Sequence, residues 1–286
     1  MNERFPRTMI GGVELPRMIV GTNWMLGYSH TSSAADALIK ARNSDAESVA
    51  RILNVFLTAG IDAVMAPFAG NDGLLDGVRL AEEQAGRRIT LIDTPIINVD
   101  DNASARREAE STIAESARIG ARFCLPHHTS VEQLVNKNVE QIPRLPDYLS
   151  MIRAHGMIPG LSAHMPELII YSDQNGYDVE TYIQLYNAAG FLMQVEVEYI
   201  HKVIWNAKKP VIVIKPMAAG RVSPFVGLTF VYSTIRPIDT VAVGCLTPLE
   251  AAEDIEIARA AIDRRVPDLS GRSSPNATAV NQPTPD

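Results

Sequence analysis

The chain has 286 residues, of which 46% are hydrophobic and 21% are charged, and its formal net charge is −7 at pH 7. This composition is typical of a globular protein of enzyme size that buries a large core. The acidic balance, without a basic stripe, argues against nucleic acid as a partner, and no apolar run approaches the ~18 residues of a membrane span.

Two cysteines, Cys124 and Cys245, lie inside apolar runs. Neither has the Cys or His spacing of a zinc or iron–sulfur site. Buried free thiols are typical of a reducing compartment, and the N-terminal segment lacks the apolar stretch of a signal peptide. We therefore expect a cytoplasmic protein that acts on a small molecule, with an oligomeric state that the sequence does not determine.

Short apolar runs alternate with amphipathic stretches along the chain. Eight runs have the length and the Val and Ile content of strands buried on both faces: Met18–Trp24, Ile61–Pro67, Ile89–Pro95, Phe123–His128, Met157–His164, Leu192–Tyr199, Val211–Pro216 and Thr240–Leu246. The expected helices are Ser44–Thr58, Leu74–Ala85, Ala103–Ile119, Val131–His155, Val179–Ala189, His201–Ala207, Pro224–Ile235 and Pro248–Ile262. Eight such repeats predict an α/β fold closed into a (β/α)8 TIM barrel. An open doubly wound sheet is the alternative, but it would need a glycine-rich first turn that this chain lacks.

Two segments do not fit the repeat. Residues 23–43 form a long polar connection after the first strand, at the end of a barrel where active sites form, so we expect a lid over the mouth. The C-terminal residues 265–286 are rich in Ser, Pro, Asn and Thr and are expected to be disordered. The sequence thus predicts one barrel domain over residues 1–264.

Polar side chains recur along the predicted strands. On the sixth predicted strand, Gln194, Glu196 and Glu198 alternate with apolar residues, which predicts that all three face the barrel interior. A carboxylate buried there needs a partner or a function. The two glutamates are therefore expected either to pair with Lys215 on the next strand or to belong to an active site.

The fourth and fifth predicted strands both end in histidine, at His127-His128 and at His164. Adjacent strand ends bring such side chains together, and imidazoles serve as general bases or metal ligands. Asp93 ends the third strand, where it either completes a divalent-metal site with His127, His164 and Glu196 or caps the following loop. We predict His127, His164 and Glu196 as the catalytic residues.

The predicted lid and the strand ends beside it carry groups suited to a hydroxylated substrate. Trp24 and Tyr28 offer aromatic surface for a sugar-like ring, and they are equally consistent with packing in a half-exposed core. The predicted substrate-binding residues are Asn23, Trp24, Tyr28, His30, Gln194 and Lys215.

Five segments, in the right order and at the right spacing, resemble the aldo-keto reductases. The stretch 12–16 followed by Gly21-Thr22 resembles the first hairpin and strand of that family, and HGMIPGLSAH (155–164) is similar to its GkiraiGvSnH segment. MQVEVEY (193–199) resembles its NQvEy strand, IKPMAAG (214–220) its sPLgrG segment, and DTVAVGCLTPLEAAEDI (239–255) its last strand and cofactor-proximal helix. The resemblance covers almost all of residues 9–262 and implies an aldo-keto reductase-like TIM barrel.

The resemblance also implies where the catalytic Asp, Tyr, Lys and His of that family would lie. Aligned from Gly60, the segment GIDAVMAPFAGN places Met65 at the Asp position and Gly70 at the Tyr position, and the strand ITLIDTP holds no lysine. The histidine alone is retained, as His127. Ordinary ketone reduction then lacks its usual proton donor, so we predict a divergent member of the family.

Three functions follow as hypotheses. The first is a non-redox lyase, isomerase or epimerase that uses the histidines and carboxylates, with or without a divalent metal, on a sugar- or polyol-like substrate. The second is a divergent NADP-dependent oxidoreductase, in which Ser162 and Gln194 match positions that touch the nicotinamide amide in the family. The third is a non-catalytic binding protein. The acids Glu250, Glu253 and Asp254 lie where the resemblance places the nucleotide phosphate, so the first hypothesis is favoured and NADPH is expected to bind weakly.

Overall fold

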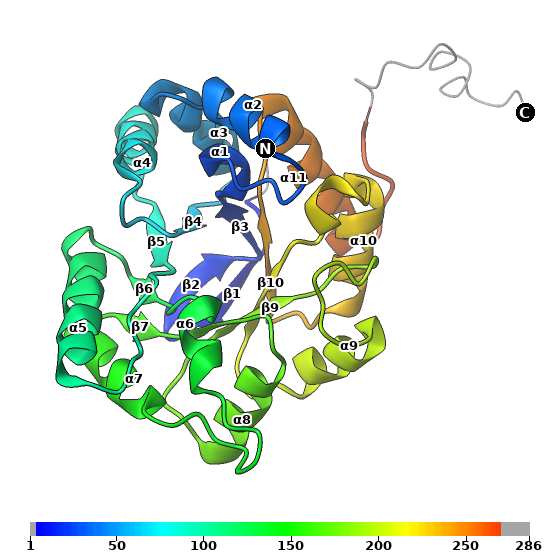
Figure 1. Cartoon of the computed structure of the whole chain (residues 1–286). Helices are drawn as coiled ribbons and strands as arrows, with labels where there is room; N and C mark the ends of the chain where they lie inside the picture. The colour runs from blue at the N-terminus through cyan, green and yellow to red at the C-terminus, as the bar shows by residue number, and fades with distance from the viewer. Residues whose placement is uncertain (1–3, 270–286) are drawn as a thin grey trace, which may run out of the picture.

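A parallel sheet forms the centre of the molecule, and helices surround it (Figure 1). The structure is a computed structural model that describes residues 4–269. The sheet has nine strand segments in the order β7-β6-β5-β4-β3-β11-β10-β9-β8. They are β3 (Met18–Gly21), β4 (Ala63–Ala66), β5 (Thr90–Asp93), β6 (Phe123–Cys124), β7 (Ile158–Pro159), β8 (Leu161–Ala163), β9 (Tyr182–Leu185), β10 (Val211–Ile214) and β11 (Thr240–Val243).

The nine segments occupy eight barrel positions, because β7 and β8 are two halves of one strand. They meet at Gly160, whose N–H donates to the Cys124 carbonyl at 3.2 Å, while the next N–H, of Leu161, donates to Thr181 at 3.1 Å. One half therefore pairs with β6 and the other with β9. A Cβ at Gly160 would lie 2.7 Å from the Thr181 carbonyl oxygen, so only glycine fits this crossing point. The predicted eight-stranded TIM barrel is confirmed.

The helices that cover the sheet follow the strands in alternation. They are α1 (Asn23–Leu26), α2 (Ser33–Arg42), α3 (Ala46–Thr58), α4 (Asp72–Ala85), α5 (Ala103–Arg118), α6 (His128–Val131), α7 (Leu145–Ala154), α8 (Glu167–Asn175), α9 (Val197–Asn206), α10 (Pro224–Thr234) and α11 (Pro248–Asp263). Side-chain caps define several of their starts: the Asp45 carboxylate accepts from Ser48 N–H, and Thr247 and Glu250 form a capping box. Every helix within residues 4–269 is too short or too polar to cross a lipid bilayer.

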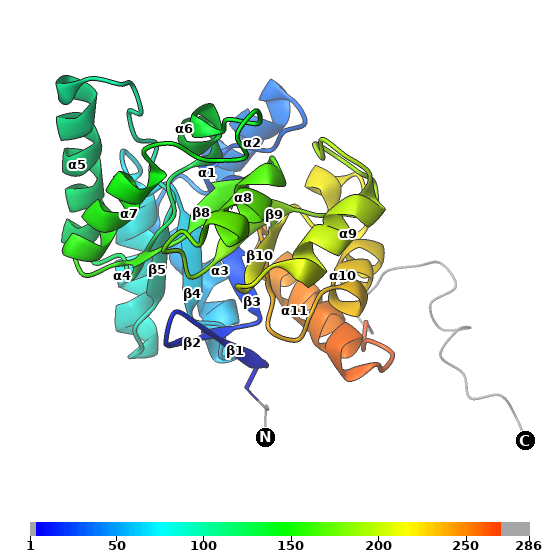
Figure 2. The same cartoon turned by 90° about the horizontal axis from the view of Figure 1, so that it is seen from below.

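A hairpin of β1 (Arg7–Ile10) and β2 (Val13–Pro16) closes one end of the barrel. Its Ile10 and Leu15 side chains are fully buried and join the cluster that fills the barrel interior, with Phe123 and Ile183 among its members. Figure 2 shows this hairpin at one end of the barrel, with α1, α2 and α6 at the other. The opposite end, where the parallel strands have their carboxyl termini, is therefore the end open to ligands.

The predicted sixth strand is wrong. Residues 192–199 form a turn and the start of α9, and the sixth barrel strand is β9, inside the range predicted as the helix Val179–Ala189. All four residues of β9 are buried, so its apolar run has no alternation to mark it as a strand. The alternation in residues 193–198 instead separates partly buried apolar side chains from exposed polar ones on the protein surface.

Other expectations also need correction. Residues 23–43 are not an irregular loop, because α1 and α2 account for most of them. Ser32 caps α2 by accepting from the Ala35 N–H. The helix α8 was not expected, and the predicted helix 131–155 consists of a short 3-10 turn, a connection and α7. Of the predicted tail, residues 270–286 lie outside the described residues, and Leu269 packs against the core.

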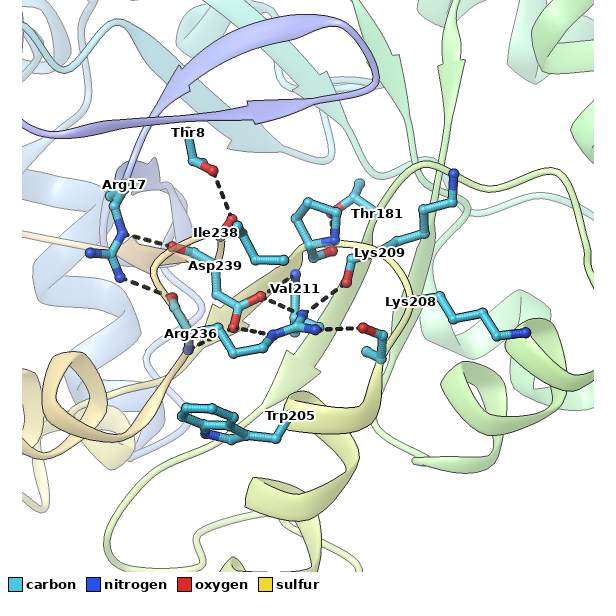
Figure 3. A network of polar contacts seen from close by, with 12 residues as sticks. Thr8, Arg17, Thr181, Trp205, Lys208, Lys209, Val211, Arg236, Ile238 and Asp239 are labelled. Carbon is cyan, nitrogen blue, oxygen red and sulfur yellow. Dashed lines mark hydrogen bonds and ion pairs between the residues drawn. The ribbon is translucent and has the colours of Figure 1, made fainter.

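A buried ion pair ties the hairpin end of the barrel together (Figure 3). The Arg236 guanidinium contacts both carboxylate oxygens of Asp239, at 2.9 and 2.7 Å, and also donates to the Lys209 carbonyl at 2.9 Å. Asp239 in turn accepts the Val211 N–H at 2.8 Å. The pair therefore joins the connection before β11 to the connection before β10, far from the open end.

Candidate functional site

A cavity of about 740 Å³ lies at the carboxyl ends of the barrel strands. Its floor consists of apolar side chains from inside the barrel, and its walls come from the strand-end loops, α1 and the start of α11. Every histidine on the predicted strand ends lines it, as does His30. The polar and aromatic residues that line the cavity include Asn23, Trp24, Tyr28, His30, His127, His128, Ser162, His164, Lys215, Glu250, Glu253 and Asp254.

Three histidines stack along one wall of the cavity. The ring centroids of His127 and His128 are 4.2 Å apart, and those of His128 and His164 are 3.6 Å apart with the planes nearly parallel at 18°. His127 lies between β6 and α6, and His164 directly follows β8. The carboxyl ends of these two neighbouring strands therefore bring the rings together. The predicted convergence of His127 and His164 is what the structure shows.

Glu132, which sequence reasoning missed, holds this cluster from behind. Its Oε1 accepts the backbone N–H groups of His164 at 2.6 Å and Met165 at 2.8 Å, and its Oε2 lies 3.6 Å from His128 Nδ1. Burial tends to raise the pKa of Glu132, but hydrogen bonds from His128 and from the two backbone N–H groups lower it overall. The spacing of four residues between His128 and Glu132 is the sequence signal that could have revealed the pair.

His127 and His164 are neutral near pH 7. Burial, together with the nearby charges of His128 and Lys215, lowers the pKa of His127 to about 4 and that of His164 to about 3. The Thr129 backbone N–H donates to His127 Nδ1 at 3.4 Å, which indicates that the neutral ring carries its proton on Nε2. His127 is thus suited to donate a hydrogen bond to an oxygen in the cavity.

Lys215 follows β10 directly and lines the same cavity as the histidines. Its Nζ lies 3.1 Å from His30 Nε2, and the Asn23 amide nitrogen lies 3.3 Å from the same ring atom. Burial lowers the pKa of Lys215 to about 8. The pKa of His30 is also lowered, by burial and by the charge of Lys215. Among residues 4–269, no carboxylate forms an ion pair with Lys215.

The backbone around Lys215 has an unusual conformation. Lys215, Ala218 and Ala219 have φ angles of 55°, 50° and 55°, in the left-handed region that residues other than glycine rarely adopt. The segment forms a tight turn closed by a 3-10 helix at residues 218–220. This turn directly follows the residue whose ammonium contacts His30 in the cavity.

The other end of the cavity is acidic. The Glu250 carboxylate accepts hydrogen bonds from the N–H groups of Leu246 and Thr247 at 2.8 and 3.1 Å. A carboxylate of the protein itself therefore caps the N-terminus of α11. Asp254 is 4% exposed, and burial raises its pKa to about 7. Its Oδ2 lies 3.3 Å from Cys245 Sγ, which donates to it. These groups suit ligand hydroxyls better than a phosphate.

Several predicted site residues lie elsewhere. Glu196 and Gln194 are exposed outside the cavity, Glu196 at the N-terminus of α9, because the strand on which they were placed does not exist. The proposed ion pair of Lys215 with Glu196 or Glu198 is therefore also wrong. Asp93 points into the helix layer, where it accepts Ser116 Oγ–H at 2.5 Å and Phe68 N–H at 3.1 Å. Within residues 4–269, no group of three or more His, Cys, Asp or Glu side chains could hold a metal ion, so the proposed metal site is not assembled.

The glutamine of the sixth barrel strand is Gln184 rather than Gln194. It is fully buried, its amide nitrogen lies 3.4 Å from the His164 carbonyl, and its Oε1 has no hydrogen-bond partner. Neighbouring Ile183 faces the cavity and pairs with Ser162, so Gln184 supports the strand end from the helix side. Met65 lines the cavity at the end of β4, and Gly70 lies in the loop beyond it.

No family model matches the sequence, and no curated protein matches it in sequence. Solved structures do match the fold. A Pseudomonas aeruginosa protein assigned as an aldo-keto reductase has a TM-score of 0.65 at 16% identity, covering 92% of this chain and 98% of its own. An aldo-keto reductase from Klebsiella pneumoniae in complex with NADPH has a TM-score of 0.57 at 15% identity, covering 93% and 92%. Another Klebsiella pneumoniae structure, with NADP and acetate, has a TM-score of 0.56 at 16% identity, covering 96% and 94%.

The chain is therefore an aldo-keto reductase-like TIM barrel. The similar structures are of enzymes that belong to an oxidoreductase family, and two of them contain NADP or NADPH. This finding overturns the favoured hypothesis of a non-redox lyase, isomerase or epimerase, which also required Glu196 in the site. The loss of the family's Asp, Tyr and Lys stays a prediction from the sequence.

Proposed function

We propose that this protein is an oxidoreductase that uses a nicotinamide dinucleotide to interconvert a small carbonyl compound and its alcohol. The observation that carries the proposal is the 740 Å³ cavity, which runs from the neutral histidines to the start of α11 across the open end of an aldo-keto reductase-like barrel. Its size and its apolar floor with few polar groups are typical of a small-molecule site.

The residues present fit the nicotinamide half of such a cofactor. The floor is formed by Met65, Ile183, Ile214 and Ala242, and two glycines, Gly21 and Gly244, leave room above the ends of β3 and β11. A Cβ at Gly244 would lie 3.2 Å from the Gly21 carbonyl oxygen. The Ser162 hydroxyl lies at the wall beside this floor, where it can hydrogen-bond a carboxamide.

The acidic end fits the hydroxyls of a ribose better than a 2′-phosphate, because carboxylates accept hydrogen bonds from hydroxyls and repel phosphates. Glu250 and Asp254 lie there, together with Glu253. We therefore propose that NADH binds more tightly than NADPH. Two of the similar structures contain NADPH or NADP, so the titration described below compares NADH with NADPH.

The substrate would lie between the histidine wall and the α1–α2 segment. His127 Nε2–H donates to the carbonyl oxygen and orients it, and His164 packs behind. Trp24 and Tyr28 cover the substrate, and Asn23 offers a hydrogen bond to a neighbouring hydroxyl, so small sugar-like aldehydes and ketones are the proposed substrates. When bound, the dihydronicotinamide supplies the hydride for the carbonyl carbon.

The test is a fluorescence titration of the full chain with NADH and with NADPH, followed by dinucleotide oxidation in the presence of small hydroxylated aldehydes and ketones. We expect a dissociation constant below ~100 µM for NADH and above ~100 µM for NADPH. Ser162→Ala should weaken NADH binding about threefold to tenfold, the effect of one lost hydrogen bond. Ser150→Ala, on the exposed face of α7, is the matched control. Failure of both dinucleotides to bind would disprove the proposal.

A further inference from the structure

We infer that Lys215 is the proton donor of this site and that His30 returns the proton from solvent, an inference that rests on the proposed reduction of a carbonyl group. The starting observation is a lysine that the cavity buries without a counter-charge. Lys215 lines the cavity, its ammonium contacts His30, and no carboxylate of residues 4–269 pairs with it. A structural lysine would be expected to pair with an acid or to reach solvent.

The position of Lys215 suits proton transfer into the cavity. Lys215, His127 and His164 line the same cavity, and the charge of Lys215 contributes to the lowered pKa values of both histidines. The two histidines are poor acids, since they are neutral near pH 7. Met65 and Gly70 offer no proton at all. Lys215 is thus the acidic group best placed to protonate the oxygen, and its lowered pKa brings it near the working range of a general acid.

His30 provides the path to solvent. Its ring is exposed on the α1–α2 segment, while its Nε2 faces Lys215 Nζ at 3.1 Å. Both Lys215 and Asn23 approach Nε2 as donors, so this nitrogen is the acceptor of a neutral ring. The Arg221 guanidinium lies 3.4 Å from the His30 carbonyl oxygen and helps to fix the residue in its left-handed conformation.

The reaction balances with these groups. In reduction, a bound dihydronicotinamide would supply the hydride for the new C–H bond at the carbonyl carbon and would itself be oxidised. One N–H bond of Lys215 breaks and an O–H bond forms on the carbonyl oxygen, giving the alcohol. The neutral amine then regains a proton that the exposed His30 takes from water. In the reverse direction, the neutral amine of Lys215 removes the alcohol proton.

The alternative role for Lys215 is a fixed positive charge that binds an anionic substrate. Lys215→Arg separates the two, because a guanidinium keeps the charge but does not give up its proton. If Lys215 donates the proton, Lys215→Arg and Lys215→Met should both lower kcat for carbonyl reduction about 10²-fold or more. The wild-type kcat should fall as pH rises through the pKa of the lysine, and this dependence should vanish in Lys215→Arg. Lys202→Met, at an exposed position on α9, is the control and should leave kcat unchanged.

Two further measurements complete the test. Carbon-13 NMR of lysine side chains in the nucleotide-free protein should show one resonance with a pKa near 8 that is absent in Lys215→Met. His30→Ala should slow turnover, and added imidazole should restore it. Turnover and a pH profile that survive in Lys215→Arg would overturn the inference while leaving the proposed oxidoreductase intact. Absence of any dinucleotide-dependent turnover in the wild type would overturn both.

Discussion

Two ionisable side chains that line the cavity, Lys215 and Asp254, have pKa values that approach neutrality from opposite directions. Burial disfavours the charged form of each, so it lowers the pKa of Lys215 to about 8 and raises that of Asp254 to about 7. Such displaced values are more frequent at functional sites than elsewhere, because a site often needs groups that change charge near the working pH. A cavity in which two lining groups change charge near pH 7 to 8 should bind charged ligands in a strongly pH-dependent way.

The raised pKa of Asp254 can be tested through the pH dependence of the free energy of unfolding. Because its folded pKa is raised above the ordinary 3.8, the stability that it contributes is fully present below about pH 4 and is lost as pH rises through about 7. Asp254→Asn cannot ionise and keeps the acceptor for Cys245. We therefore expect the variant to match the wild type at pH 4 and to be more stable by about 2–4 kcal/mol at pH 8.

Urea unfolding at the two pH values measures this difference. Asp76→Asn, at an exposed position on α4, is the matched control. The same pH dependence of stability in Asp254→Asn as in the wild type would show that Asp254 is ionised in the folded protein throughout.

At the scale of secondary-structure elements, one end of the barrel holds the cavity and the other end holds a buried ion pair. The open end carries the cavity, and hydrogen bonds such as that of Glu132 with the His164 backbone hold its segments in place. The hairpin end carries the Arg236–Asp239 pair, in which Asp239 is fully buried (Figure 3). A buried pair of this kind is costly to break, because the partner left behind is a buried charge without compensation.

Asp239→Asn should therefore destabilise the protein by about 3–5 kcal/mol, since Arg236 would keep its charge in a buried position. NADH affinity measured below the unfolding transition should stay the same, because the pair lies at the end of the barrel away from the cavity. Chemical denaturation measures the first effect, and Glu115→Gln, which breaks an exposed pair with Arg118, should change stability little. A stability loss no larger than that of the control would refute a structural role for the pair.

At the scale of the whole molecule, the alternation of strands and helices was enough to predict the barrel. Seven of the eight predicted strands contain a strand of the sheet, because buried parallel strands are continuous apolar runs that the sequence shows directly. The remaining strand, β9, is the sixth of the barrel and lies inside the predicted helix Val179–Ala189; its four buried residues show no alternation that would mark them as a strand. The alternating residues 193–198 on the surface therefore matched the pattern of a strand better than β9 itself did.

The site was predictable to the extent that its residues lie at strand ends. His127, His164 and Lys215 fall at the ends of correctly predicted strands, and all three line the cavity. Glu132 lies behind the histidines, outside the cavity lining, and its spacing of four residues from His128 was its one sequence signal. Asp254 lies on α11, and only the resemblance to the family placed it near a ligand. Glu196 was misplaced because its direction was inferred from strand alternation, whereas it lies at the N-terminus of the helix α9.

The closed hairpin end has a consequence for the order in which ligands come and go. With Ile10 and Leu15 sealing the interior, the proposed dinucleotide and substrate would share one opening. The nicotinamide would lie on the floor beside Ser162, and the substrate would lie above it under the α1–α2 segment. The dinucleotide must then enter before the substrate and leave after the product, so initial rates should follow an ordered scheme. NAD should compete with NADH, whereas the alcohol product should not, and a random scheme in product-inhibition kinetics would place the two ligands side by side instead.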